Sequence, residues 1–269
     1  MADQHGWEEA RKLKDGGKLI PFIGSGLSTH LGIPPSDRLV DIIASELGWD
    51  PEILRMSGDL PQIAEYYVSI KRGIGTLRSR LDKEFFRKNE QIRSSRCHMA
   101  IVENNFPVIY TTNYDDLIER AFEIQGVRHR VISHLADFSE VSSGETQIVK
   151  FHGTFSDDSS LVLTESSYFE RLEFDSALDI RLRSDILGKV LLFIGYSFRD
   201  LDVRYLIYKL HKLTQKQGVV DGQLPIAIMT TFSADEVQQT LWKLRNVSII
   251  ELAPLDPSKS LAEFLEYLK

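Results

Sequence analysis

The hydrophobic positions along the chain form short apolar runs separated by stretches with helical spacing. The runs predict strands at residues 18–24, 107–112, 147–153, 190–197, 224–229 and 247–252. The stretches around them predict helices at residues 7–15, 36–47, 117–122, 203–210, 233–245 and 258–268. This alternation indicates a Rossmann-like α/β fold, a doubly wound and mostly parallel sheet with helices on both faces.

One region departs from the alternation. Residues from about 50 to 106 hold helical patterns and few strand signals, and Leu60, Ala64 and Val68 fall on one helical face. We therefore expect a single domain over residues 1–269 that carries a helical insert at approximately 50–106. The basic residues of the insert favour solvated helix faces, with a nucleic-acid or partner surface as the alternative.

Composition narrows the function classes. The 269 residues include 32 Lys and Arg against 39 Asp and Glu, a net charge of −7, so the charge does not indicate nucleic-acid or anionic-membrane binding. Cys97 is the only cysteine, which excludes an intramolecular disulfide and a four-cysteine zinc site. The polar N-terminus lacks a secretory signal, and no apolar run approaches the roughly 20 residues that span a bilayer. We expect a cytoplasmic protein.

Four segments place glycine or polar residues just after an expected strand, where open α/β sheets bind ligands. The first is Gly24-Ser25-Gly26-Leu27-Ser28. Its glycines let the backbone approach a phosphate, whose oxygens free amides can hold. The full dinucleotide fingerprint would place glycine where Thr29 stands, so an ordinary turn is an equal alternative for this segment alone.

The second segment contains Thr112, Asn113 and Asp115. An amide and a carboxylate two residues apart at a strand end can point into the same crevice, where they would bind ribose hydroxyls, water or an amide. Helix capping is the alternative, because Asn and Asp are both favoured at helix starts. Capping accounts more readily for one of the two residues than for both.

The third and fourth segments follow the strands at 147–153 and 190–197. His152, at a strand end before a glycine, is a candidate general base near neutral pH. Gly195 can admit a ligand close to the backbone, and Ser197 can donate a hydrogen bond to it. An ion pair between Arg199 and Asp200 across the next helix's first turn is the structural alternative.

Together the four segments resemble the sirtuin family, and more closely its bacterial sirtuin-like branch. Residues 24–28 resemble the family's phosphate-binding loop, 111–115 its segment around nicotinamide and ribose, 150–153 the segment with the catalytic histidine, and 195–197 the loop on the adenosine side. The resemblance implies catalytic roles for Asn113, Asp115 and His152, and NAD⁺-binding roles for Gly24, Ser25, Gly26, Ser28, Thr112, Gly195 and Ser197.

The chain also departs from the protein-deacylating sirtuins. Those enzymes carry a four-cysteine zinc module after the histidine, which Cys97 alone cannot build. The resemblance therefore implies the zinc-free branch and an NAD⁺ glycohydrolase that cleaves NAD⁺ to nicotinamide and ADP-ribose, with NAD⁺ as its substrate and no zinc. The alternatives are a protein deacylase or ADP-ribosyltransferase, and a non-catalytic module that binds NAD⁺ or ADP-ribose.

The same resemblance implies an antiphage defence effector that depletes NAD⁺ once infection triggers it. Such an enzyme needs restraint, and the chain is too short to carry a large sensor domain. We therefore expect control by homo-oligomer assembly or by a separate partner, such as a HerA-like ATPase or another sensor protein encoded alongside.

Overall fold

The computed structural model describes residues 4–34, 36–196, 201–215, 224–233 and 235–269. Within them, seven parallel strands form one sheet in the order β3-β4-β2-β1-β5-β6-β7. The strands are β1 (Leu19–Ile23), β2 (Val108–Thr111), β3 (His129–Ile132), β4 (Thr146–Lys150), β5 (Val190–Ile194), β6 (Ala227–Thr231) and β7 (Val247–Glu251). The first strand lies near the middle of the sheet, where Phe22 pairs with Tyr110 of β2 and Phe193 of β5.

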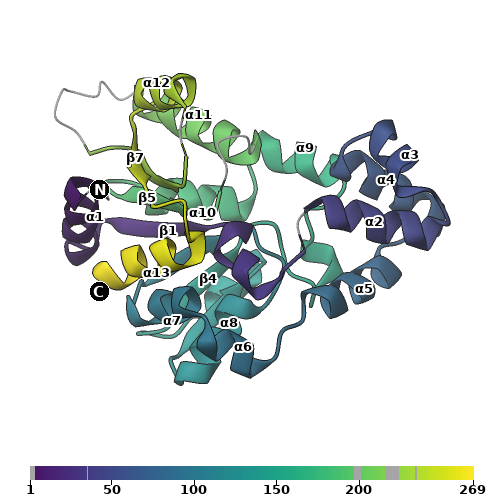
Figure 1. Cartoon of the computed structure of the whole chain (residues 1–269), viewed down its shortest axis with the longest axis horizontal. Helices are drawn as coiled ribbons and strands as arrows, with labels where there is room; N and C mark the ends of the chain where they lie inside the picture. The colour runs from purple at the N-terminus through teal and green to yellow at the C-terminus, as the bar shows by residue number, and fades with distance from the viewer. Residues whose placement is uncertain (1–3, 35, 197–200, 216–223, 234) are drawn as a thin grey trace.

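Helices cover both faces of the sheet and give it two apolar cores (Figure 1). One face carries α1 (Gln4–Asp15), α7 (Arg96–Glu103), α8 (Leu117–Gln125) and α13 (Pro257–Tyr267). The other face carries α10 (Ala177–Asp185), α11 (Leu201–Gln215) and α12 (Glu236–Leu244). Successive strand residues alternate between the two cores, as in Ile23 and Phe22, because side chains of a strand point to opposite faces in turn.

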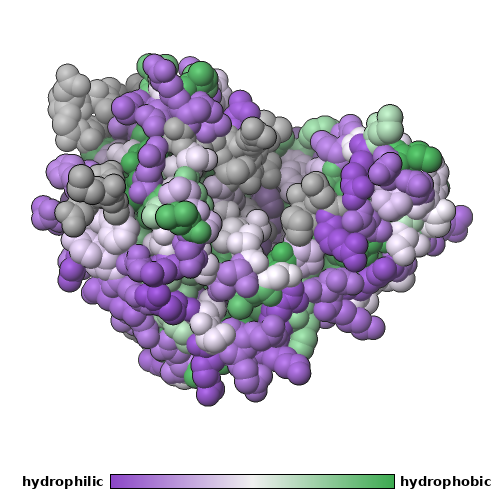
Figure 2. Space-filling model, in the orientation of Figure 1, coloured by the Kyte–Doolittle hydropathy of each residue, from purple (hydrophilic) through white to green (hydrophobic). Residues whose placement is uncertain are grey.

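A lobe of helices stands beside the sheet, to the right in Figure 1. It consists of α2 (Ser36–Leu47), α3 (Pro51–Ser57), α4 (Leu60–Lys71) and α5 (Gly75–Phe85), and α4 packs on α9 (Glu165–Glu173). The side chains of Asp50 and Asp59 cap the starts of α3 and α4. By contrast, α6 (Asn89–Ser94) and α7 pack on α8. The surface is hollowed between the lobe and the rest of the molecule (Figure 2).

The predicted fold class is confirmed, and the described part of the sheet is entirely parallel. Each strand expected from the sequence is present within a few residues of its expected limits. The sequence interpretation missed β3, a short edge strand of sequence His-Arg-Val-Ile in which only Ile132 is buried. Among the described residues, no helix is long and apolar enough to cross a membrane.

Candidate functional site

A pocket of about 260 Å³ lies between the carboxyl ends of the central strands and the helical lobe. Open parallel sheets bind ligands at this edge, next to the point where the strand order reverses. We call it the strand-end pocket. It is lined by Ser25, Ile33, Pro34, Leu39, Leu60, Phe85, Thr112, Asn113, Tyr114, Asp115, His152, Tyr168 and Tyr196.

The loop after β1 meets the loop after β5 at the base of this pocket. A Cβ atom on Gly26 would lie 2.6 Å from the Cα atom of Gly195, whose φ is +75°. One on Gly24 would lie 2.8 Å from the ring of Tyr196. Close backbone packing therefore requires glycine at these positions, and it leaves Ser25 facing the pocket.

Asn113 is fixed by hydrogen bonds that join two strand ends. Its side-chain Nδ2 donates to the Gly24 carbonyl oxygen at 3.3 Å, and its backbone N–H donates to Thr111 Oγ1 at 3.0 Å. The neighbouring Thr112 hydroxyl shares a hydrogen bond of 2.8 Å with the Tyr196 hydroxyl. Asn113 is only 5% exposed, so its amide is held in place before any ligand arrives.

Asp115 is a buried carboxylic acid in the wall of the pocket. Burial raises its pKa to about 6, and the positive charge of Lys150 opposes that rise. One of its carboxylate oxygens accepts from the backbone N–H of Leu117, the first residue of α8, at 3.1 Å, although the N-cap position of that helix belongs to Asp116. Asp115 therefore contacts the start of α8 and lines the pocket at the same time.

His152 follows the end of β4 and is also buried. Its ring packs edge-on against Tyr168 of α9, with centroids 5.5 Å apart. Burial, together with the positive charge of Arg171, lowers the pKa of His152 to about 3. The imidazole is therefore neutral near pH 7, the form that can accept a hydrogen bond.

Arg171 and Gly153 shape the backbone around His152. The Arg171 guanidinium donates to the Phe151 carbonyl oxygen at 2.5 Å and pairs with the fully buried Asp179 at 3.2 Å. Gly153 has a φ of +80°, and a Cβ atom there would lie 2.1 Å from the Ser160 carbonyl oxygen. This turn therefore depends on glycine.

The structure brings Ser25, Thr112, Asn113, Asp115 and His152 together in one pocket. Gly24, Gly26 and Gly195 are not among its lining residues, but their backbones pack together beside Ser25 and Tyr196, which line it. Ser28 is fully buried, shares a hydrogen bond of 3.2 Å with His98 Nε2, and does not line the pocket. Ser197, Arg199 and Asp200 lie outside the described residues.

Sequence reasoning assigned no role to Tyr168, Tyr196 or Lys150. Tyr196 directly follows Gly195 at a strand end, a position that could have drawn attention to it. Tyr168 reaches the pocket from α9, and no motif in the sequence predicts that this helix packs beside the pocket. Lys150 ends β4 and is fully buried. A lysine at the end of a strand expected to be buried was the signal in the sequence that could have indicated its role.

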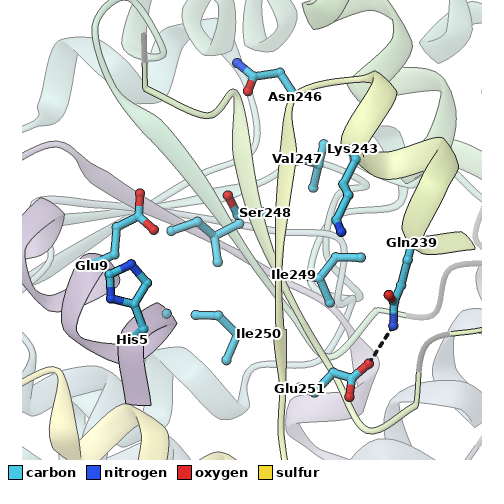
Figure 3. A pocket seen from close by; sticks show the side chains of 12 residues that line it. His5, Glu9, Gln239, Lys243, Asn246, Val247, Ser248, Ile249, Ile250 and Glu251 are labelled. Atoms are coloured by element: carbon cyan, nitrogen blue, oxygen red, sulfur yellow. Dashed lines mark hydrogen bonds between the residues drawn. The ribbon is translucent and has the colours of Figure 1, made fainter. Parts of the chain in front are cut away.

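A larger cavity, of about 580 Å³, lies along the outer edge of β7 (Figure 3). We call it the β7 groove. His5 and Glu9 of α1 stand on one side of it, and Gln239 and Lys243 of α12 on the other. Gln239 donates a hydrogen bond of 3.0 Å to Glu251 across its end. None of the residues expected from the sequence to bind a ligand lines this groove.

The parallel sheet and the strand-end pocket define a Rossmann-like α/β protein with its ligand pocket at the carboxyl edge of the strands. The SIR2-like domain family matches residues 107–250, over half of the chain. The chain belongs to this family, and the resemblance to the bacterial sirtuin-like branch is confirmed.

Relatives of this chain carry names that state an activity or a role. The NAD(+) hydrolase ThsA of Cytobacillus dafuensis is 31% identical over 198 residues, which cover 73% of this chain and 39% of the relative. ThsA of Enterococcus faecium is 29% identical over 68% of this chain and 38% of its own length. Defense-associated sirtuin 2 of Bacillus subtilis is 29% identical over 73% of this chain and 20% of its own. The chain thus spans about two fifths or less of these relatives.

Proposed function

We propose that this chain hydrolyses NAD⁺ in the strand-end pocket and releases nicotinamide and ADP-ribose. The proposal is carried by one observation: Asn113, Asp115 and His152, which follow two different strands, line the same pocket. Similarity to proteins named NAD(+) hydrolase over 73% and 68% of the chain supports the same reaction.

The reaction breaks the bond between the nicotinamide nitrogen and C1′ of the ribose. The electron pair of that bond neutralises the pyridinium ring as it leaves, so the leaving group needs little help from an acid. Water forms the new bond to C1′ and loses a proton. The protein must therefore orient the dinucleotide, stabilise a positively charged ribosyl centre and position the water.

The pocket residues supply groups suited to these tasks. Asn113 would hold the water or the ribose hydroxyls, and Asp115 would bind the carboxamide of nicotinamide. The neutral imidazole of His152 would accept the proton of the water or bind a ribose hydroxyl. Both Asn113 and His152 are nearly buried, so their hydrogen bonds act with little competition from solvent.

The remaining contacts would hold the rest of the dinucleotide. The backbone at Gly24 and Gly26 and the Ser25 hydroxyl would bind the phosphates, with Thr112 beside them. Gly195 and Ser197 would line the adenosine end. We assign Ser28 to support of the loop, because its hydroxyl is already bonded to His98.

The test is product analysis of the purified protein incubated with NAD⁺. We expect equal amounts of nicotinamide and free ADP-ribose by chromatography, and loss of both in Asn113→Ala. An O-acyl-ADP-ribose product or a labelled acceptor protein would instead establish a deacylase or transferase. If the protein binds NAD⁺ tightly but forms no products, even when proteins encoded by neighbouring genes are added, it is a binding module.

We further propose that the protein is a cytoplasmic antiphage effector, controlled by homo-oligomer assembly or by a partner such as a HerA-like ATPase. The name of the Bacillus subtilis relative, Defense-associated sirtuin 2, supports the defence role. The same product assay, repeated with the proteins encoded by neighbouring genes, would reveal such control as a change in rate. An unchanged rate and a monomer at every concentration would refute it.

A further inference from the structure

A fully buried lysine lies directly behind the strand-end pocket. Lys150 is the last residue of β4 and is 0% exposed. Its ammonium donates to the Asp115 carbonyl oxygen at 2.5 Å and lies 2.9 Å from Glu119 Oε1 of α8. Two residues further along the chain stands His152. One ammonium group therefore connects both parts of the chain that carry the candidate catalytic residues.

A contribution to stability does not explain well why Lys150 and Glu119 form a buried ion pair. Removing two charges from water costs about as much as their attraction returns, and a well-packed apolar pair is often as stable. In addition, Glu119 Oε2 is buried and has no hydrogen-bond partner among the described residues. An uncompensated buried acceptor carries a further cost. The contact between Lys150 and Asp115 offers a reason for the pair to exist.

We propose that Lys150, held by Glu119, is a positioning residue of the strand-end pocket: its ammonium ties the loop after β2 to the end of β4 and holds Asp115 against the pocket. In the sheet, Lys150 pairs with Thr111, the last residue of β2, and its side chain reaches four residues beyond that strand. An apolar side chain could fill this space but could not bind the carbonyl.

The same ammonium determines the charge that the pocket presents. Three charged groups act on Asp115: Lys150 at the end of β4, and Glu119 and Asp116 on the side of α8. Asp115 also shares the pocket with the neutral His152. With both carboxylates ionised, the group of Asp115, Glu119 and Lys150 carries one net negative charge. Without Lys150, burial and Glu119 would both favour the protonated form of Asp115.

This charge would give the pocket a preference between the two redox forms of the dinucleotide. The nicotinamide ring of NAD⁺ is a cation, whereas that of NADH is neutral. A carboxylate that faces the ring attracts the first form only. The preference rests on the proposed function, since it assumes that the nicotinamide end occupies this pocket.

The experiment compares wild type with Glu119→Gln and with the double variant Lys150→Met/Glu119→Gln, which removes both members of the buried ion pair. The carboxyl ¹³C signal of Asp115, assigned with Asp115→Asn, is titrated by NMR. We expect its midpoint to fall in Glu119→Gln and to rise by about one pH unit or more in the double variant. A filler role for Lys150 predicts no such opposite shifts, and equal midpoints in all three proteins would overturn the inference.

Binding measurements extend the test to the substrate. At pH 7 the double variant should lose about twofold or more in affinity for NAD⁺, because less of Asp115 is ionised, while keeping its affinity for ADP-ribose, which lacks nicotinamide. Should the double variant fail to fold, Glu119→Gln alone decides, because a midpoint that stays or rises refutes the charge role. A titration that shifts as expected in a protein that never cleaves NAD⁺ would refute the proposed function and leave the inference standing.

Discussion

The strand-end pocket and the β7 groove use the same sheet in opposite ways. The pocket stands at the carboxyl ends of central strands and is enclosed by the helical lobe, whereas the groove follows the outer side of an edge strand. The groove is about twice as large, at about 580 Å³ against about 260 Å³. Among its polar side chains, labelled in Figure 3, those of His5, Lys243 and Glu251 are exposed.

The pocket differs in what its walls contain. Asp115 and His152 are both buried. Burial raises the pKa of Asp115 and lowers the pKa of His152, so it favours the uncharged form of each side chain. Buried titratable groups cost free energy, so they gather where chemistry requires them. The comparison teaches that the two cavities differ in burial more than in volume, and the desolvated polar groups make the strand-end pocket the candidate site.

The largest expected effect comes from removing a reacting group from the pocket. His152→Ala should lower the rate of nicotinamide release by about 100-fold or more, since a positioned general base or ribose ligand is lost. The rate is measured by chromatography, with circular dichroism to confirm folding. A folded variant that retains the full rate would remove His152 from the mechanism and weaken the contrast with the groove.

The next effect concerns the backbone that carries His152. Gly153→Ala combines a left-handed φ with a Cβ atom 2.1 Å from the Ser160 carbonyl oxygen, so it should destabilise the fold by about 3 kcal/mol. Gly144→Ala is the matched control, because Gly144 has a similar φ of +79° and the nearest atom, in the Arg128 side chain, lies 3.4 Å away. It should cost about 1 kcal/mol. Urea unfolding measures both, and equal losses would show that the turn is not tightly packed.

A pH titration separates the two regions further. The pKa of Asp115 is raised from 3.8 to about 6, so the carboxylate is present above that pH, and NAD⁺ binding should weaken as the pH falls through about 6. Calorimetry from pH 5 to 8 measures the loss. Asp115→Asn should abolish this dependence, whereas Glu251→Gln in the groove should leave it intact. An unchanged acid limb in Asp115→Asn would assign it to another group.

The same shift has a consequence for stability. Between pH 3.8 and about 6, the folded protein holds the Asp115 proton more tightly than the unfolded chain does. Asp115 therefore stabilises the fold at low pH, and this contribution is lost as the pH rises through about 6. Asp115→Asn should therefore be more favourable at pH 7 than at pH 4. The change in the free energy of unfolding from wild type to Asp115→Asn should be about 2 kcal/mol more stabilising at pH 7 than at pH 4, measured by urea unfolding of both proteins at both pH values.

The sequence predicted the sheet and the place of the pocket because both follow from local patterns. Apolar runs such as 190–194 announce buried parallel strands, and residues just beyond them must meet at one edge. The Asn113 and His152 segments were found in this way. Ser28 shows the limit, because its burial against His98 depends on how α7 packs, which no residue near Ser28 encodes.

Tyr168 and Lys150 illustrate the same limit from the opposite side. Tyr168 enters the pocket because α9 packs against α4, a contact between segments about 100 residues apart. The partners of Lys150 lie on another strand end and on α8. Long-range packing decides such contacts, whereas spacing and residue type reveal only what lies within one element. The helical insert, whose limits were drawn from the change in hydrophobic pattern, stays a prediction.

The smallest expected effect belongs to the β7 groove and completes the comparison. Lys243→Ala and Gln239→Ala remove exposed or half-buried side chains from α12, and Gln239→Ala also removes its hydrogen bond to Glu251. Each should change the free energy of unfolding by no more than about 0.5 kcal/mol, and NAD⁺ cleavage by less than about twofold. Both are measured beside His152→Ala in the same assays. A tenfold loss of cleavage in a fully folded groove variant would mean that the larger cavity takes part in the reaction, and that enclosure and burial do not distinguish the working site.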